Sequence, residues 1–233
     1  MSDTASRTDW GLEARRLVRA NQHGALSTLS AKLGGMPFGS IAPYVADHDG
    51  CPVILLSQLA EHTRNLQADP RCSLLAHPCA DDAQAAGRVT LAGRALDLGR
   101  PPELAARYLR HLPQAEPLLG MSDFSLWKIQ LEAVRLIAGF GRIHWVAAPD
   151  YLADGAALAT AEPGLLDWAS SEPDLLWRIA GRNRVEAQQV TAVGFDLDGV
   201  DLRADGRLLR VDFPAPVSDA DAVRSAALEL AQR

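Results

Sequence analysis

Four consecutive polar residues, His62 to Asn65, follow an apolar segment and combine side chains that can hold an anion. The segment Pro52–Ser57 has the length and continuous hydrophobicity of a buried strand, and a short helix is predicted over about residues 59–69. The four polar residues therefore fall in the first turns of that helix, where free backbone N–H groups and the helix dipole favour negative charge. This arrangement predicts a phosphate site. The alternative interpretation is an ordinary surface helix whose polar side chains face water.

Three further groups of residues could contact a flat or anionic ligand. Phe38-Gly39-Ser40 enters a predicted strand, where glycine lets a ligand approach the backbone and the serine hydroxyl can form a hydrogen bond. Arg88 and Arg94 are six residues apart on another predicted strand, so they point to the same face. His144 lies on the last strand of this part of the chain. The alternative interpretations are a plain hairpin loop for the first group, solvated arginines for the second and a structural histidine for the third.

Composition and charge argue against several classes of protein. The 233 residues are 48% hydrophobic, enough for a substantial core, and the net charge of −6 argues against nucleic-acid binding. No apolar run approaches the roughly 18 residues that a membrane span needs, so we expect no membrane partner. The cysteines Cys51, Cys72 and Cys79 fit reduced thiols in the cytoplasm. Cys72, His77 and Cys79 could form a metal site, but a fourth ligand at a suitable spacing is lacking, and we expect no bound metal.

The predicted elements divide the chain into two domains joined by a linker. The first domain, residues 1–149, contains short strands connected by turns rich in Gly, Asp and Pro, which points to a closed antiparallel barrel. The linker is expected over residues 150–163. Residues 164–233 are predicted to form a small α+β domain, in which two helices flank a meander with turns at Asp198-Gly199 and Asp205-Gly206.

Five sequence segments carry a resemblance to a known family. They are, in chain order, GALSTLS, GGMPFGSIAPYV, PVILLSQLAEHTRNLQADPRCSLL, GRVTLAGRA and DFSLWKIQLEAVRLIAGFGRIHWV. Together they resemble the pyridoxamine-5′-phosphate-oxidase-like family of FMN-binding split barrels, in particular its branch of haem-utilisation (HugZ-type) proteins. The resemblance covers residues 14–146 and implies an α+β fold, a split antiparallel β-barrel followed by a small α+β domain.

The resemblance implies a homodimer that binds FMN at its subunit interface and acts as an oxidoreductase on an unidentified small molecule. The FMN-binding residues that it transfers to this chain are Phe38, Gly39, Ser40, Ser57, His62, Thr63, Arg64, Asn65 and Arg88. His62 or Thr63 stands where the pyridoxamine oxidases have a lysine, which weakens the expected affinity for phosphate. Residues 168–172 replace the Met-Asn-x-Asp-His motif common at the start of the small domain, so no metal or haem chemistry is expected there.

Two alternatives to the FMN-dependent oxidoreductase stay open. The first is haem binding with oxidative degradation, as in the HugZ-type proteins. It requires an axial ligand to the haem iron. The barrel offers three candidates, His144, His77 and His62, and we name His144 as the possible ligand. The second is a barrel without a cofactor that serves as a dimeric interaction protein.

Overall fold

The computed structural model describes residues 9–78, 80, 82, 85–139 and 141–232, so Cys79 lies outside the described residues. Its helices and strands are, in chain order, α1 (Trp10–Arg19), β1 (His23–Leu29), β2 (Pro37–Ala46), β3 (Pro52–Ser57), α2 (Glu61–Ala68), β4 (Arg71–Ala76), β5 (Arg88–Gly99), α3 (Pro102–His111), η1 (Pro113–Ala115), α4 (Glu116–Leu119), β6 (Phe124–Ile137), β7 (Ile143–Ala147), α5 (Ala148–Tyr151), α6 (Ala156–Ser171), α7 (Pro173–Arg182), β8 (Val190–Asp196), β9 (Gly199–Ala204), β10 (Arg207–Asp212) and α8 (Ala220–Leu230).

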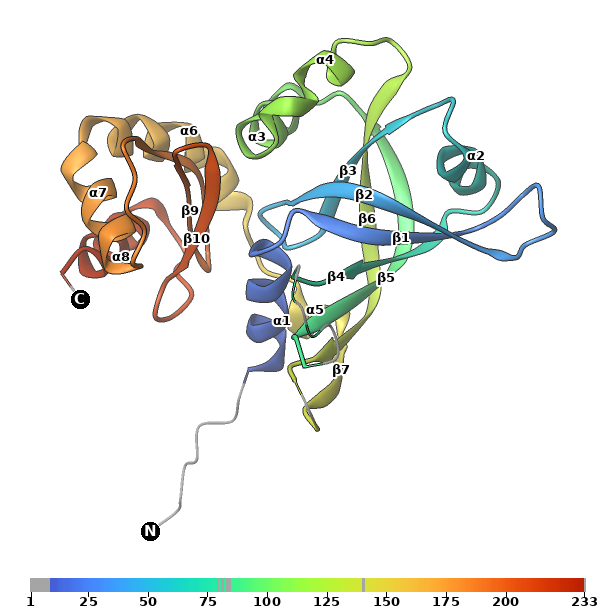
Figure 1. Cartoon of the computed structure of the whole chain (residues 1–233), viewed down its shortest axis with the longest axis horizontal. Helices are drawn as coiled ribbons and strands as arrows, with labels where there is room; N and C mark the ends of the chain where they lie inside the picture. The colour runs from blue at the N-terminus through green and yellow to red at the C-terminus, as the bar shows by residue number, and fades with distance from the viewer. Residues whose placement is uncertain (1–8, 79, 81, 83–84, 140, 233) are drawn as a thin grey trace.

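Six antiparallel strands close into a barrel, the larger body in Figure 1. Their order is β3-β2-β1-β4-β5-β6, and pairing of β3 with the start of β6 closes the ring, while β7 pairs with the end of β6. Side chains alternate as a barrel requires: in β5 the odd-numbered residues from Val89 to Ala95 are buried. The predicted α+β fold with an antiparallel barrel is confirmed.

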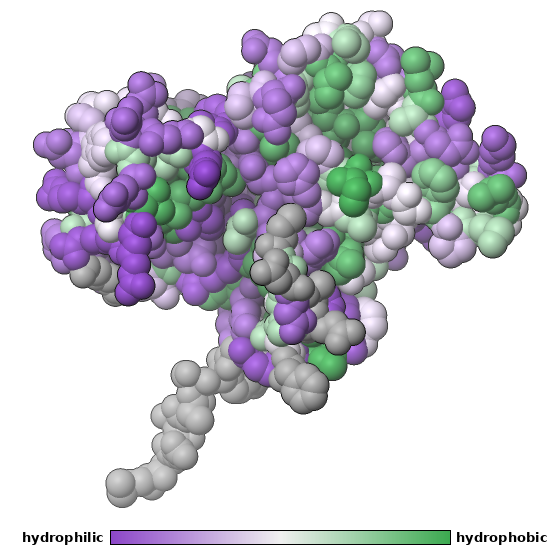
Figure 2. Space-filling model, viewed as in Figure 1, coloured by the Kyte–Doolittle hydropathy of each residue, from purple (hydrophilic) through white to green (hydrophobic). Residues whose placement is uncertain are grey.

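Helices cover the barrel at three places. Helix α1 adds Ala14 and Val18 to the barrel core, and the Tyr44 hydroxyl donates to the Val18 carbonyl at 2.7 Å. Helix α2 packs against β1, and α3 packs on the outside of β2 and β3 through Tyr108 and Leu112. The surface of the barrel still carries hydrophobic side chains, visible in Figure 2. Ile41 of β2 is 72% exposed.

The second domain is a three-stranded antiparallel sheet, β10-β9-β8, with its own hydrophobic core. Helices α7 and α8 lie on the side of this sheet away from the barrel (Figure 1). The meander predicted from Asp198-Gly199 and Asp205-Gly206 is confirmed, because both dipeptides connect paired strands. Among the described residues, no helix combines the length and apolarity needed to cross a membrane.

The segment expected as a linker, residues 150–163, contains parts of two helices. Helix α5 ends at Tyr151, and α6 begins at Ala156 and continues through Pro163. A proline inside a helix removes one backbone hydrogen bond, which is why the sequence suggested a break. Leu158 and Leu165, on either side of it, are buried in the core of the second domain, so packing stabilises the helix across the proline.

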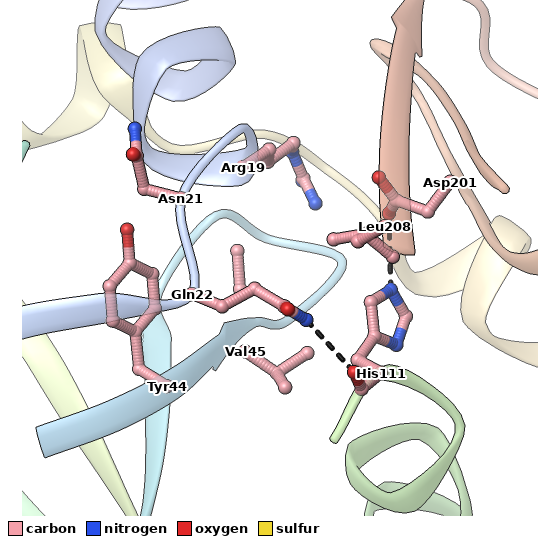
Figure 3. Close-up of a pocket in the computed structure, with 9 residues that line it drawn as sticks. Arg19, Asn21, Gln22, Tyr44, Val45, His111, Asp201 and Leu208 are labelled. Atoms are coloured by element: carbon pink, nitrogen blue, oxygen red, sulfur yellow. Dashed lines mark hydrogen bonds and ion pairs between the residues drawn. The ribbon is translucent and has the colours of Figure 1, made fainter. Parts of the chain in front are cut away.

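Buried ion pairs join the two domains. Arg19 of α1 contacts Asp196 of the second sheet at 2.9 Å, and all but a small fraction of both side chains is buried. The Nε2 of His111 of α3 lies 3.1 Å from the Asp201 carboxylate (Figure 3). The other ring nitrogen of His111 lies 2.9 Å from the Arg107 carbonyl. These contacts fix the second domain against α1 and α3.

Candidate functional site

The start of helix α2 brings two of the predicted site residues together. His62 lies in its first turn, and the His62 Nδ1 is 3.2 Å from the Ser40 Oγ of β2. Burial lowers the pKa of His62, so its imidazole is neutral at neutral pH. A neutral imidazole oriented by a hydroxyl is a suitable ligand for a metal centre.

Thr63 and Asn65 point into the protein rather than toward a ligand. Both side chains are fully buried. The Asn65 carboxamide accepts from the Ala31 N–H at 3.0 Å and donates to the Thr28 hydroxyl at 3.0 Å. Asn65 therefore ties α2 to β1 and the loop that follows it, a structural role.

We predict that Asn65→Ala lowers the free energy of unfolding by about 2 kcal/mol, because it removes two hydrogen bonds made by a fully buried side chain, each worth about 1 kcal/mol. Urea denaturation measures this loss. Gln67→Ala, at an exposed position of the same helix, is the matched control and is expected to change stability by less than about 0.5 kcal/mol. Equal stability of the two variants would contradict the structural role.

The other predicted residues near α2 are held by local contacts. Ser57 donates to the Asp123 carboxylate at 2.5 Å and accepts from the Leu59 N–H at 3.1 Å. Arg64 is exposed and lies 3.7 Å from Glu61, whose carboxylate occupies the first turn of α2 and opposes binding of an anion there. Phe38 is half-buried on the same face of β2 as Ser40.

Gly39 faces the opposite side of β2. A side chain built there would meet no atom within 4 Å, so within one chain nothing requires glycine at this position.

Arg88 and His144 lie away from this cluster. Arg88 begins β5 and pairs with Ile137, whereas Arg94 pairs with Arg71, just after α2. Six residues of strand separate the two arginines by about 20 Å. His144 stacks on Trp10 of α1, with 3.8 Å between ring centroids. One chain thus brings Ser40, Ser57, His62 and Arg64 to the α2 end of the barrel, and Arg88 and His144 to the other.

The structure reveals a second polar cluster that the sequence did not indicate. Glu162 of α6 receives the side chains of Arg107 and Arg110 of α3, and His48 lies 3.7 Å from the same carboxylate. The members come from residues 48, 107–110 and 162, so no local motif connects them. Within the described residues, no three His, Cys, Asp or Glu side chains are grouped as a metal site.

Residues 6–153 match the family described as CREG, beta-barrel. The matched residues include the barrel and α5. The chain belongs to this family. It is also similar to the chloroplastic haem oxygenase HOZ of Arabidopsis thaliana, with 30% identity over 239 residues that cover 94% of this chain and 72% of the relative. The haem oxygenase HutZ of Vibrio cholerae is 30% identical over 133 residues, covering 54% of this chain and 74% of HutZ.

Two solved structures extend the comparison across both domains. The protein Atu2129 of Agrobacterium tumefaciens, of unknown function, superposes with a TM-score of 0.81 over 98% of each chain at 23% identity, which shows the shared fold. A haem-binding protein from Mycobacterium smegmatis superposes with a TM-score of 0.58, also over 98% of each chain, at 31% identity. The similarity to haem proteins therefore includes the second domain.

Proposed function

We propose that this protein binds haem and takes part in its oxidative degradation. The observation that carries the proposal is the 30% identity to a haem oxygenase over 94% of the chain. The free thiols Cys51 and Cys72 support a reducing compartment such as the cytoplasm. Burial raises the pKa of both thiols to about 12, so neither acts as a nucleophile.

His62 is the histidine whose surroundings best fit an iron ligand. His48 and His111 are buried among the ion pairs between the domains, and the ring of His144 is covered by Trp10. His62 is half-buried, neutral and oriented through Nδ1 by Ser40, which leaves its Nε2 for a ligand. This differs from His144, the possible ligand that the sequence suggested.

Exposed hydrophobic residues around the barrel support a homodimer. Ile41, Leu59 and Trp145 are 72%, 71% and 70% exposed, and contact with a second subunit would remove their apolar surface from water. A partner subunit that covers them would shield a flat apolar ligand from water. When bound, haem supplies a redox-active iron that activates oxygen, while the chain binds, orients and shields it.

We expect His62→Ala to weaken haem binding at least tenfold, about 1.4 kcal/mol, because it removes the iron ligand. Titration of haem into the purified protein, followed by the Soret band, measures the dissociation constant. Ser40→Ala should weaken binding less, since it removes only the hydrogen bond that orients His62.

His77→Ala is the matched control for this titration. His77 is exposed at the end of β4, with its Nδ1 2.9 Å from the Pro78 carbonyl, and its removal should leave the affinity unchanged. Unchanged haem affinity in His62→Ala would exclude His62 as the ligand. A wild-type protein that binds no haem would overturn the proposed function itself.

FMN binding stays a prediction supported by the split-barrel resemblance. The surroundings of α2 favour haem over FMN, because Glu61 stands beside Arg64 in the first turn and Asn65 and Thr63 face inward. The absorption spectrum of the purified protein distinguishes the two cofactors. A protein that takes up neither would favour the cofactor-free interpretation.

A further inference from the structure

Two adjoining hollows between the domains form one cleft. The larger, of about 570 Å³, lies where α3 meets α6, and its wall is mostly apolar, with contributions from Pro101, Pro102, Leu104, Ala106, Ala159 and Pro163. The smaller, of about 260 Å³, lies between the β2–β3 turn and the segment that leads into α6. Asp47, His48 and Ala159 line both hollows, so a single ligand can extend from one into the other. This volume and these apolar walls are typical of a site for a small molecule.

The smaller hollow is acidic. Asp47, Asp49 and Asp154 supply three carboxylates to its lining, and Lys128 supplies one ammonium group. The Lys128 ammonium lies 2.7 Å from the carboxylates of both Asp47 and Asp49, so two carboxylates share one cation. Asp154 is exposed and forms no ion pair within the described part of the chain. This end of the cleft therefore carries an excess of negative charge.

The larger hollow does not reverse this sign. Arg107 and Arg110 line it, but both contact Glu162, and Glu103 adds a second carboxylate. The two cations and two carboxylates of this hollow cancel. His48 lies 3.5 Å from Asp47 and 3.7 Å from Glu162, and even a proton on its ring would leave the whole cleft negative. The charge of the lining therefore disfavours an anion and favours a cation.

We infer that this cleft binds a small organic cation, an ammonium group attached to an apolar body. The ammonium group would lie in the smaller hollow beside Asp154 and Asp49, and the apolar body would lie against the proline and alanine walls of the larger one. The attraction is stronger there than in bulk water, because the walls of a cleft lower the effective dielectric around the charges. The inference does not depend on haem, since the lining shares no residue with the Ser40–His62 site.

The test compares two probes of the same shape, the cation 2-naphthylmethylamine and the neutral 2-naphthalenemethanol. Each is titrated calorimetrically into the haem-free full-length protein at neutral pH and low ionic strength, where the charges are screened least. We expect the amine to bind at least tenfold more tightly than the alcohol. Equal affinities for the two probes, or no binding of the amine, would overturn the inference.

An exposed carboxylate locates the ammonium group without disturbing the buried ion pairs. Asp154→Asn should reduce the preference for the amine over the alcohol at least threefold, because it removes one of the negative charges at the acidic end. Asp167→Asn removes the same charge from an exposed position of α6 outside the cleft lining, and it should leave the preference unchanged. The same preference in Asp154→Asn and in the wild type would contradict the assigned position.

A second variant tests the position of the apolar body. Ala159 is exposed on α6 and lines both hollows, so Ala159→Phe should fill their junction and weaken binding of the amine at least tenfold. Ala157→Phe, at an exposed position of the same helix outside the cleft lining, is the matched control and should bind the amine as the wild type does. Unchanged binding in Ala159→Phe would place the probe elsewhere and contradict the assignment.

Discussion

Replacement of Asp196 by asparagine is expected to lower the free energy of unfolding by about 3–5 kcal/mol, the cost of removing one partner from a buried ion pair. Asp196 is fully buried and receives Arg19 at 2.9 Å and Arg210 at 2.6 Å. Burial alone opposes its charge, but the two guanidinium groups hold its pKa far below the usual range. Asparagine keeps the shape and removes the charge, which leaves two buried cations with too few anions.

Urea denaturation of both proteins at neutral pH measures this loss. Asp221→Asn is the matched control, because Asp221 also pairs with an arginine, Arg224 at 3.1 Å, but its side chain is 91% exposed. Water screens such a pair, so the control should unfold close to the wild-type midpoint. If Asp196→Asn behaved like the control, the ion pairs between the domains would not hold the structure together.

The fold could be predicted from the sequence because its determinants are local. The continuous apolar run of β3 and the turns at Asp198-Gly199 and Asp205-Gly206 mark strands and hairpins within a few residues. The boundary between the domains was harder to predict from the sequence. Pro163 reads as a helix breaker, and only the burial of Leu158 and Leu165 in the second core shows why α6 passes through it.

The position of the candidate site could be predicted from the sequence, but the orientation of its side chains could not. Spacing places His62 to Asn65 on one short helix, but it does not tell which side chains face the barrel. The structure turns Thr63 and Asn65 inward and joins His62 to Ser40, a contact across 22 residues. The polar cluster around Glu162 could not be predicted from the sequence, since Arg107 and Glu162 are 55 residues apart in the chain.

Acid should weaken the contact between the domains through Glu162. Burial by itself would raise the pKa of this carboxyl, but Arg107, His48 and Arg110 outweigh it and lower the pKa from 4.5 to about 2. A carboxyl whose pKa is depressed by folding stabilises the protein above its unfolded pKa, and this stability is lost as the pH falls through the folded value. The difference between the two pKa values corresponds to about 3 kcal/mol.

We therefore expect stability to fall between about pH 4.5 and pH 2, with Glu162 alone accounting for a loss of about 2 kcal/mol by pH 3. Asp196 and Asp201 act in the same direction, because their pKa values are also lowered in the folded protein. Urea midpoints at pH 6 and pH 3 measure the loss in the wild type and in Glu162→Gln. The variant should be less stable at pH 6 and should lose less on acidification, because glutamine does not titrate. A parallel decline in both proteins would show that Glu162 carries no part of the acid sensitivity, and that folding leaves the pKa of the carboxyl shared by Arg107 and Arg110 unchanged.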